Sequence, residues 1–263
     1  MPLLEHIKEL RDRLIKSVVA ILILFFVFFS VKEHIYGFLV QPLANVLAES
    51  GENRRMIFTA LHEAFFTYIK VSFWTALFVG FPFVALQFWR FVAPGLYFKE
   101  KRALLPYLVI SPILFFLGGA LVYYFIFPLA WKFFISFEAQ GTASSLAVQL
   151  EPKVNEYLSL VMRLIFAFGL SFQLPVVLTL LARAGLTSSK GLARKRKYAI
   201  VFSFIGAAII TPPDVISQVG LAIPIIILYE ISIFAVRIVE KRRKKEDAAA
   251  EERLSDDKDL HTT

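Results

Sequence analysis

Cysteine is absent from this chain of 263 residues. Its absence excludes disulfide bonds, thiolate metal sites and cysteine nucleophiles. The phosphate-binding loop, the dinucleotide-binding Gly-x-Gly-x-x-Gly, the zinc-binding His-Glu-x-x-His and the nucleophile elbow Gly-x-Ser-x-Gly are also missing. The only histidines are dispersed and lack the spacing of metal ligands: His6, His34, His62 and His261. We therefore expect no catalytic residue, no metal, no cofactor and no enzyme.

Charge is also scarce, because Asp, Glu, Lys and Arg make up only 19% of the chain, whereas 57% is hydrophobic and 28 residues are Phe. Soluble domains usually carry about 25% charged residues. Six stretches are long, apolar and free of charge except for Glu230: residues 17–31, 71–88, 103–131, 164–182, 198–213 and 215–236. We predict an all-α polytopic membrane protein with six transmembrane helices. A single membrane domain over 1–240 would precede a disordered cytoplasmic tail over 241–263.

The segments outside these stretches differ in character. Leu3, Ile7, Leu10 and Leu14 recur at helical spacing among charged residues, which predicts an amphipathic helix lying in the membrane interface. Residues 41–63 and 138–156 are more polar and are predicted to be loops, with Pro42 among the helix breakers of the first.

The basic residues fix the expected orientation. Twenty Lys and Arg flank the membrane on the side of both termini, and five flank it on the other side. The positive-inside rule therefore places both termini in the cytoplasm, together with the loop after residue 90. Because topology explains the net charge of +8, we expect no nucleic-acid partner.

Three stretches should deviate from a straight span. Residues 103–131 exceed the roughly 20 residues needed to cross, so this helix must tilt, kink or protrude, and Pro128 is one of several places to kink. Pro175 should bend the stretch 164–182. The stretch 198–213 reaches only about 24 Å, less than the roughly 30 Å of hydrocarbon.

Four polar residues fall within or beside the apolar stretches: Lys70, Arg163, Gln173 and Glu230. Charges inside a membrane are costly and are candidates for function by default. Lys70 and Arg163 lie near helix ends, however, where snorkelling explains them equally well. Pairing and ligand binding are both open for Glu230. The amide of Gln173 should face protein or a wet cavity.

The loop FVAPGLYFKEKR (91–102) joins two apolar stretches. Pro94 and the following glycine favour a tight turn, and the aromatic residues suit a membrane interface. Glu100 is the lone carboxylate in a cluster of Lys and Arg. Local charge balance explains it, or else it is a fixed anionic point that receives a cationic ligand.

Four blocks, in order, resemble the TatC family: HIKELRDRL (6–14), the loop 91–102, FGLSFQLP (168–175) and TPPDVISQ (211–218). The resemblance covers roughly residues 3–238. It implies that the chain is the signal-peptide receptor and core of the twin-arginine translocase, which moves folded proteins across the bacterial inner membrane. The chain would then be a multi-pass protein of that membrane. Its implied partners are twin-arginine signal peptides, the single-span proteins TatA and TatB, membrane lipid and further copies of the receptor.

The resemblance also implies roles for particular residues. The site for the twin-arginine motif would comprise Glu9, Arg11, Phe91, Pro94 and Glu100. Thr211 and Gln218 would lie where the helices of TatA and TatB bind. The family often has Glu where this chain has Gln173, so a step that uses that carboxylate would have to proceed without its charge.

Two functions follow from the residues themselves. Guanidinium groups bind carboxylates in a bidentate geometry, so two adjacent arginines call for fixed acids such as Glu9 and Glu100 at one surface. The alternative is a six-span secondary transporter that uses Lys70, Arg163 and Glu230. Transporters of this kind commonly show internal repeats, and no convincing repeat is present.

Overall fold

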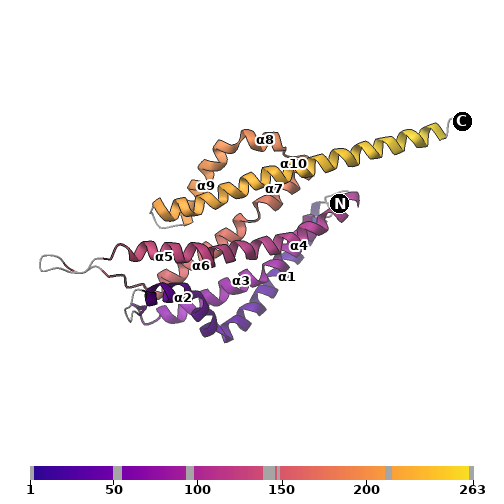
Figure 1. The fold of residues 1–263 in the computed structure, drawn as a ribbon. Coiled ribbons are helices and arrows are strands. Elements are labelled where there is room, and N and C mark those ends of the chain that lie inside the picture. Colours follow the sequence, from indigo (N-terminus) through magenta and orange to yellow (C-terminus); the bar gives the residue numbers. More distant parts are fainter. Residues whose placement is uncertain are drawn as a thin grey trace. The chain divides into compact units, whose positions relative to one another are not determined.

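The computed structural model describes residues 3–49, 55–92, 98–138, 146, 149–210 and 215–260. These residues are almost entirely helical, which confirms the all-α class (Figure 1). Five helical stretches are long and apolar enough to cross a membrane. The fifth predicted span, residues 198–213, corresponds to α9 (Arg196–Ile210), which has only 15 residues, so the six-span count remains a prediction. Two compact units make up the chain, Met1–Leu170 and Ser171–Thr263, and a single membrane domain over 1–240 also remains a prediction.

The first unit begins with α1 (Leu3–Ser30), one continuous helix. The predicted interfacial helix is therefore not a separate element but the first turns of this helix. α1 packs along α3 (Glu63–Val92) (Figure 1). The two backbones approach closely at Gly80, where an added Cβ would lie 3.1 Å from a methyl carbon of Leu24.

The predicted loop beginning at residue 41 is wrong for its first part. Residues there belong to α2 (Lys32–Glu49), which contains Pro42 within the helix. Leu39, Leu43, Val46 and Leu47 are buried on one side of it. Burial of this apolar stripe outweighs the hydrogen bond that a proline removes from a helix interior.

The long third stretch does deviate from a straight helix. It forms α4 (Phe98–Leu121), a π-helical turn (Val122–Ile126) and α5 (Phe127–Ile135). In the π-turn the N–H of Phe127 donates to the carbonyl of Val122, five residues back. Pro128 follows directly and has no N–H to donate, which favours a change in the hydrogen-bond register at this point.

Aromatic rings form the centre of the first unit. Phe115 of α4 is fully buried and stacks on Phe81 of α3 with ring centroids 3.7 Å apart. The ring of Phe166, from α6 (Val154–Ser171), meets Phe115 edge-on. An added Cβ on Gly169 would lie 2.7 Å from the Phe115 ring. Glycine is therefore required at residue 169 for α6 to approach the aromatic core this closely.

The stretch 164–182 is interrupted as predicted. α6 ends at Ser171, a turn follows at Phe172 and Gln173, and α7 (Leu174–Arg183) begins with Pro175 in its first turn. This arrangement suits a residue that cannot donate a backbone hydrogen bond.

The second unit contains α7, α8 (Ser189–Arg194), α9 and α10 (Val215–Leu260). α10 packs against each of the other three helices (Figure 1). Ala182, Leu192, Ile233 and Val236 form its buried cluster. The structure differs from the predicted disordered tail, because α10 continues through residues 241–260. Glu, Lys, Arg and Ala dominate that segment and all favour helix.

Candidate functional site

The first candidate site lies where the amino-terminal end of α1 meets the carboxyl-terminal end of α3. The ring of His6 stacks on Phe91, with centroids 4.3 Å apart and planes at 18°. This contact holds one predicted signal-binding residue, Phe91, against the helix that carries two others, Glu9 and Arg11. The sequence analysis did not predict a role for His6 in this site.

Glu9 and Arg11 have different surroundings although only two residues separate them. Glu9 is 25% exposed and accepts hydrogen bonds from Arg13, the one from Nε being 3.0 Å long. Arg11 is 65% exposed and bonds to the adjacent Asp12. His6, Glu9 and Arg13 follow one another at helical spacing, so they share the face of α1 that His6 turns toward α3. Glu9 is therefore on the side of α1 that carries His6.

The remaining two predicted residues of this site are Pro94 and Glu100. Pro94 lies outside the described residues. Glu100 belongs by its backbone to the first turn of α4, and its side chain is likewise outside the description.

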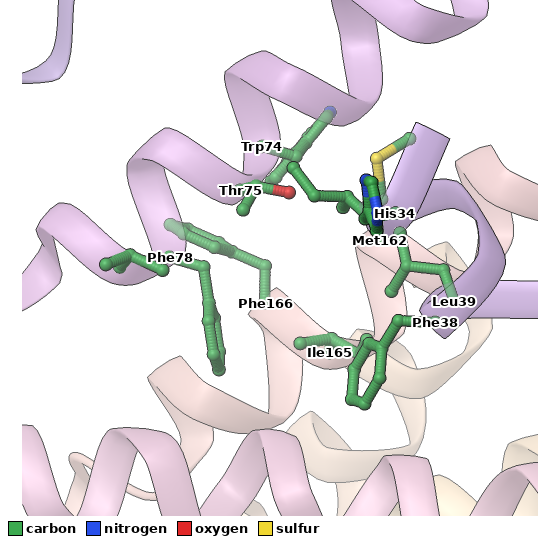
Figure 2. A pocket seen from close by; sticks show the side chains of 11 residues that line it. His34, Phe38, Leu39, Trp74, Thr75, Phe78, Met162, Ile165 and Phe166 are labelled. Carbon is green, nitrogen blue, oxygen red and sulfur yellow. The ribbon is translucent and has the colours of Figure 1, made fainter. Parts of the chain in front are cut away.

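The second candidate site is an apolar cavity of about 420 Å³ in the first unit. Figure 2 shows side chains from three helices converging on it: His34, Phe38 and Leu39 from α2, Trp74, Thr75 and Phe78 from α3, and Met162, Ile165 and Phe166 from α6. The hydrogen-bonding side-chain groups among the lining residues are the imidazole of His34, the hydroxyl of Thr75 and the indole N–H of Trp74. The cavity suits an apolar guest, because it offers large buried surface and few hydrogen-bonding groups.

Lys70 lies on α3 one turn before Trp74, which lines this cavity. Its ammonium donates a 2.8 Å hydrogen bond to the side chain of Asn155 in α6. The carboxylate of Glu63 in turn accepts from the backbone of Asn155 and of Thr59. Backbone hydrogen bonds of Ile57 with residues 152 and 154 join the same two segments. The polar contacts of Lys70 thus connect α3 to the start of α6.

Arg163 lies in α6, and its charged side chain is exposed. In the second unit Glu230 pairs with Arg196 across α10 and α9 at 2.7 Å. Gln173 occupies the turn that separates α6 from α7.

The predicted partner-helix site lies at the hairpin of α9 and α10. The amide nitrogen of Gln218 donates to the carbonyl oxygen of Phe204 at 3.2 Å. Thr211 lies outside the described residues. Within the part of the chain that the structure describes, no group of three or more His, Asp or Glu side chains could hold a metal ion.

Known proteins are similar to this chain over most of its length. A family model described as "Sec-independent protein translocase protein (TatC)" matches residues 5–224. The chain belongs to the TatC family. A TatC of Magnetococcus marinus is 52% identical, over 95% of this chain and 89% of its own length. The TatC of Escherichia coli is 39% identical, over 94% of this chain and 92% of its own.

A solved structure agrees with the TatC fold. The crystal structure of a twin-arginine translocase receptor TatC superposes with a TM-score of 0.76 at 39% identity, covering 89% of this chain and 99% of that one. The predicted family and the multi-pass location in the inner membrane are confirmed. The relatives are named Sec-independent protein translocase proteins, which favours translocation over secondary transport.

Proposed function

We propose that this TatC-family chain is the signal-peptide receptor of a twin-arginine translocase and acts by binding rather than by catalysis. The observation that carries the proposal is the contact of His6 with Phe91, which holds the amino-terminal end of α1, the helix that contains Glu9, against the end of α3. In the proposed site the carboxylate of Glu9 and the ring of Phe91 both receive the signal peptide. A guanidinium group pairs with the first and stacks on the second.

The partial burial of Glu9 favours this role. At 25% exposure its carboxylate is shielded more than a surface group, so a charge-assisted hydrogen bond to it is worth more than a fully solvated one. Both contacts from Arg13 end on Oε1. The carboxylate therefore retains acceptor capacity on Oε2 for an incoming arginine.

The apolar region of the signal peptide is proposed to bind in the apolar cavity. Phe91 and Phe78 are 13 residues apart on α3, which corresponds to about 20 Å of helix. The apolar region of a signal peptide, about 7–15 residues long, spans a similar distance when helical. A peptide whose arginines bind near Glu9 can therefore reach the cavity with its apolar part. TatA and TatB are the proposed partners at the hairpin of α9 and α10, and self-association is proposed for the receptor complex.

Binding of a twin-arginine signal peptide and of its Lys-Lys variant to the purified protein tests the proposal. We expect the twin-arginine peptide to bind at least about tenfold more tightly, because lysine cannot form the bidentate pair. Equal affinity would contradict it.

Photocrosslinking tests the path of the apolar part. A probe at Thr75, which lines the cavity, should capture the bound peptide. A probe at Phe73, two residues away on the exposed side of α3, is the matched control and should not. Equal capture from both residues would exclude the cavity as the binding place.

A further inference from the structure

A second, polar cavity of about 430 Å³ lies in the second unit and shares no residue with the proposed receptor site on α1 and α3. Its lining includes Gly185, Thr187, Ser188, Lys190, Glu240 and Arg243. Two candidate membrane spans, Val154–Arg183 and Gln218–Arg243, end beside it. The cavity is therefore expected at the depth where lipid headgroups lie.

Local contacts hold the walls of this cavity in place. Glu240 accepts hydrogen bonds from the backbone and the hydroxyl of Ser189, at 2.9 and 2.6 Å. A guanidinium nitrogen of Arg243 donates to the carbonyl of Arg183 at 3.0 Å. Gly185 has a φ of +76°, and an added Cβ would lie 3.2 Å from the same nitrogen. Glycine thus allows both the left-handed turn after α7 and the close approach of Arg243.

The charges in the cavity favour an anion. Arg243 and Lys190 supply two cations against the single carboxylate of Glu240, which Ser189 already engages. The guanidinium group offers five N–H donors in a planar fork that matches phosphate oxygens. The hydroxyls of Thr187 and Ser188 are further donors on the same wall. Phosphate is therefore the ligand chemistry that the cavity suits.

The surroundings distinguish a lipid phosphate from a soluble one. Leu186 lies between the lining residues Gly185 and Thr187 and is 75% exposed. An apolar side chain exposed at the end of two spans is favourable among acyl chains and unfavourable in water. Basic pockets between transmembrane helices commonly bind anionic headgroups. We propose that this cavity binds the phosphate headgroup of an anionic phospholipid.

Native mass spectrometry of the full-length protein in detergent tests this proposal. We expect the first phosphatidylglycerol to bind at least about tenfold more tightly than phosphatidylcholine. Lys190→Gln should weaken phosphatidylglycerol about threefold, and Lys190→Gln with Arg243→Gln about tenfold or more. The control pair, Lys195→Gln with Arg242→Gln, removes the same charge from the same segments outside the cavity and should leave the affinity within about twofold.

Three results would overturn the proposal. The two phospholipids could bind equally, or the control pair could weaken binding as much as the cavity pair, which would indicate general attraction to a basic surface. Glycerol phosphate could also displace the lipid and bind with the same affinity, which would make the cavity a site for soluble phosphates. Lys190→Gln alters an exposed side chain, so it gives a result even if loss of Arg243 disturbs the fold.

Discussion

Replacement of Glu9 by Gln should weaken a twin-arginine signal peptide while leaving its Lys-Lys variant much less affected. The change keeps the size and hydrogen-bonding capacity of the side chain and removes its charge. A charge-assisted hydrogen bond contributes about 1.5–3 kcal/mol, and the 25% exposure of Glu9 reduces that range through partial screening. We expect a loss of about 1–2 kcal/mol, or about 5- to 30-fold in affinity.

The same substitution also removes the internal pair with Arg13, so a matched variant is needed. Arg13→Gln abolishes that pair but leaves the carboxylate charged and without its internal partner. Exposed pairs of this spacing contribute only about 0.3–0.5 kcal/mol. Arg13→Gln should therefore bind the twin-arginine peptide as tightly as the parent protein or up to about twofold more tightly.

Fluorescence anisotropy with labelled peptides measures the affinity of the parent and of each variant for both peptides. A double-mutant cycle between Glu9 and the peptide arginines extracts their coupling. Equal weakening by Glu9→Gln and Arg13→Gln would refute the reasoning, because it would mean that only the internal pair matters. A coupling near zero would refute the contact itself, even if transport stopped.

The remaining predictions concern other parts of the chain. Glu100→Gln should cost a twin-arginine signal about 5- to 30-fold in affinity and a Lys-Gln signal less, and an equal loss for both would assign Glu100 to loop structure. Gly169→Ala should destabilise the protein by about 1–3 kcal/mol in detergent melts, because its Cβ meets the buried Phe115 ring, whereas Gly37→Ala meets nothing within 4 Å and serves as control. Gln218→Leu should reduce crosslinking to TatA and TatB but not signal binding; unchanged crosslinking would exclude this site. A cysteine at Leu146, which is 91% exposed, should react with an impermeant reagent from the trans side in intact cells, and labelling only after lysis would reverse the predicted topology.

The sequence predicts those parts of the fold that depend on local chemistry. The apolar stretches became helices because their length and composition favour spans, and Pro175 marks the start of α7 because proline fits a first turn. Segment 32–49 was missed in part, because Pro42 suggested a break. The recurrence of Leu39, Leu43, Val46 and Leu47 was the helical pattern that could have revealed α2.

In the candidate sites, too, contacts within one helix could be predicted from the sequence, whereas contacts between helices could not. The pair of Glu9 and Arg13 was recognisable from its spacing of four residues, although sequence analysis did not single it out. The stacking of His6 on Phe91 joins residues 85 positions apart, and no local pattern indicates it. The apolar cavity combines α2, α3 and α6, so its volume depends on packing that single stretches do not specify.

The placement of α1 has a consequence for biogenesis. Only 6% of its membrane stretch is buried within the protein, and its main neighbour, α3, is synthesised later. During synthesis α1 must therefore remain in lipid alone, which its mean hydropathy of 2.2 permits. The pair of Glu9 and Arg13 lies within this one helix, so the carboxylate can be neutralised before any other span has been inserted. The carboxylate of Glu9 thus has a partner from the start of membrane insertion, through a contact that needs no tertiary structure.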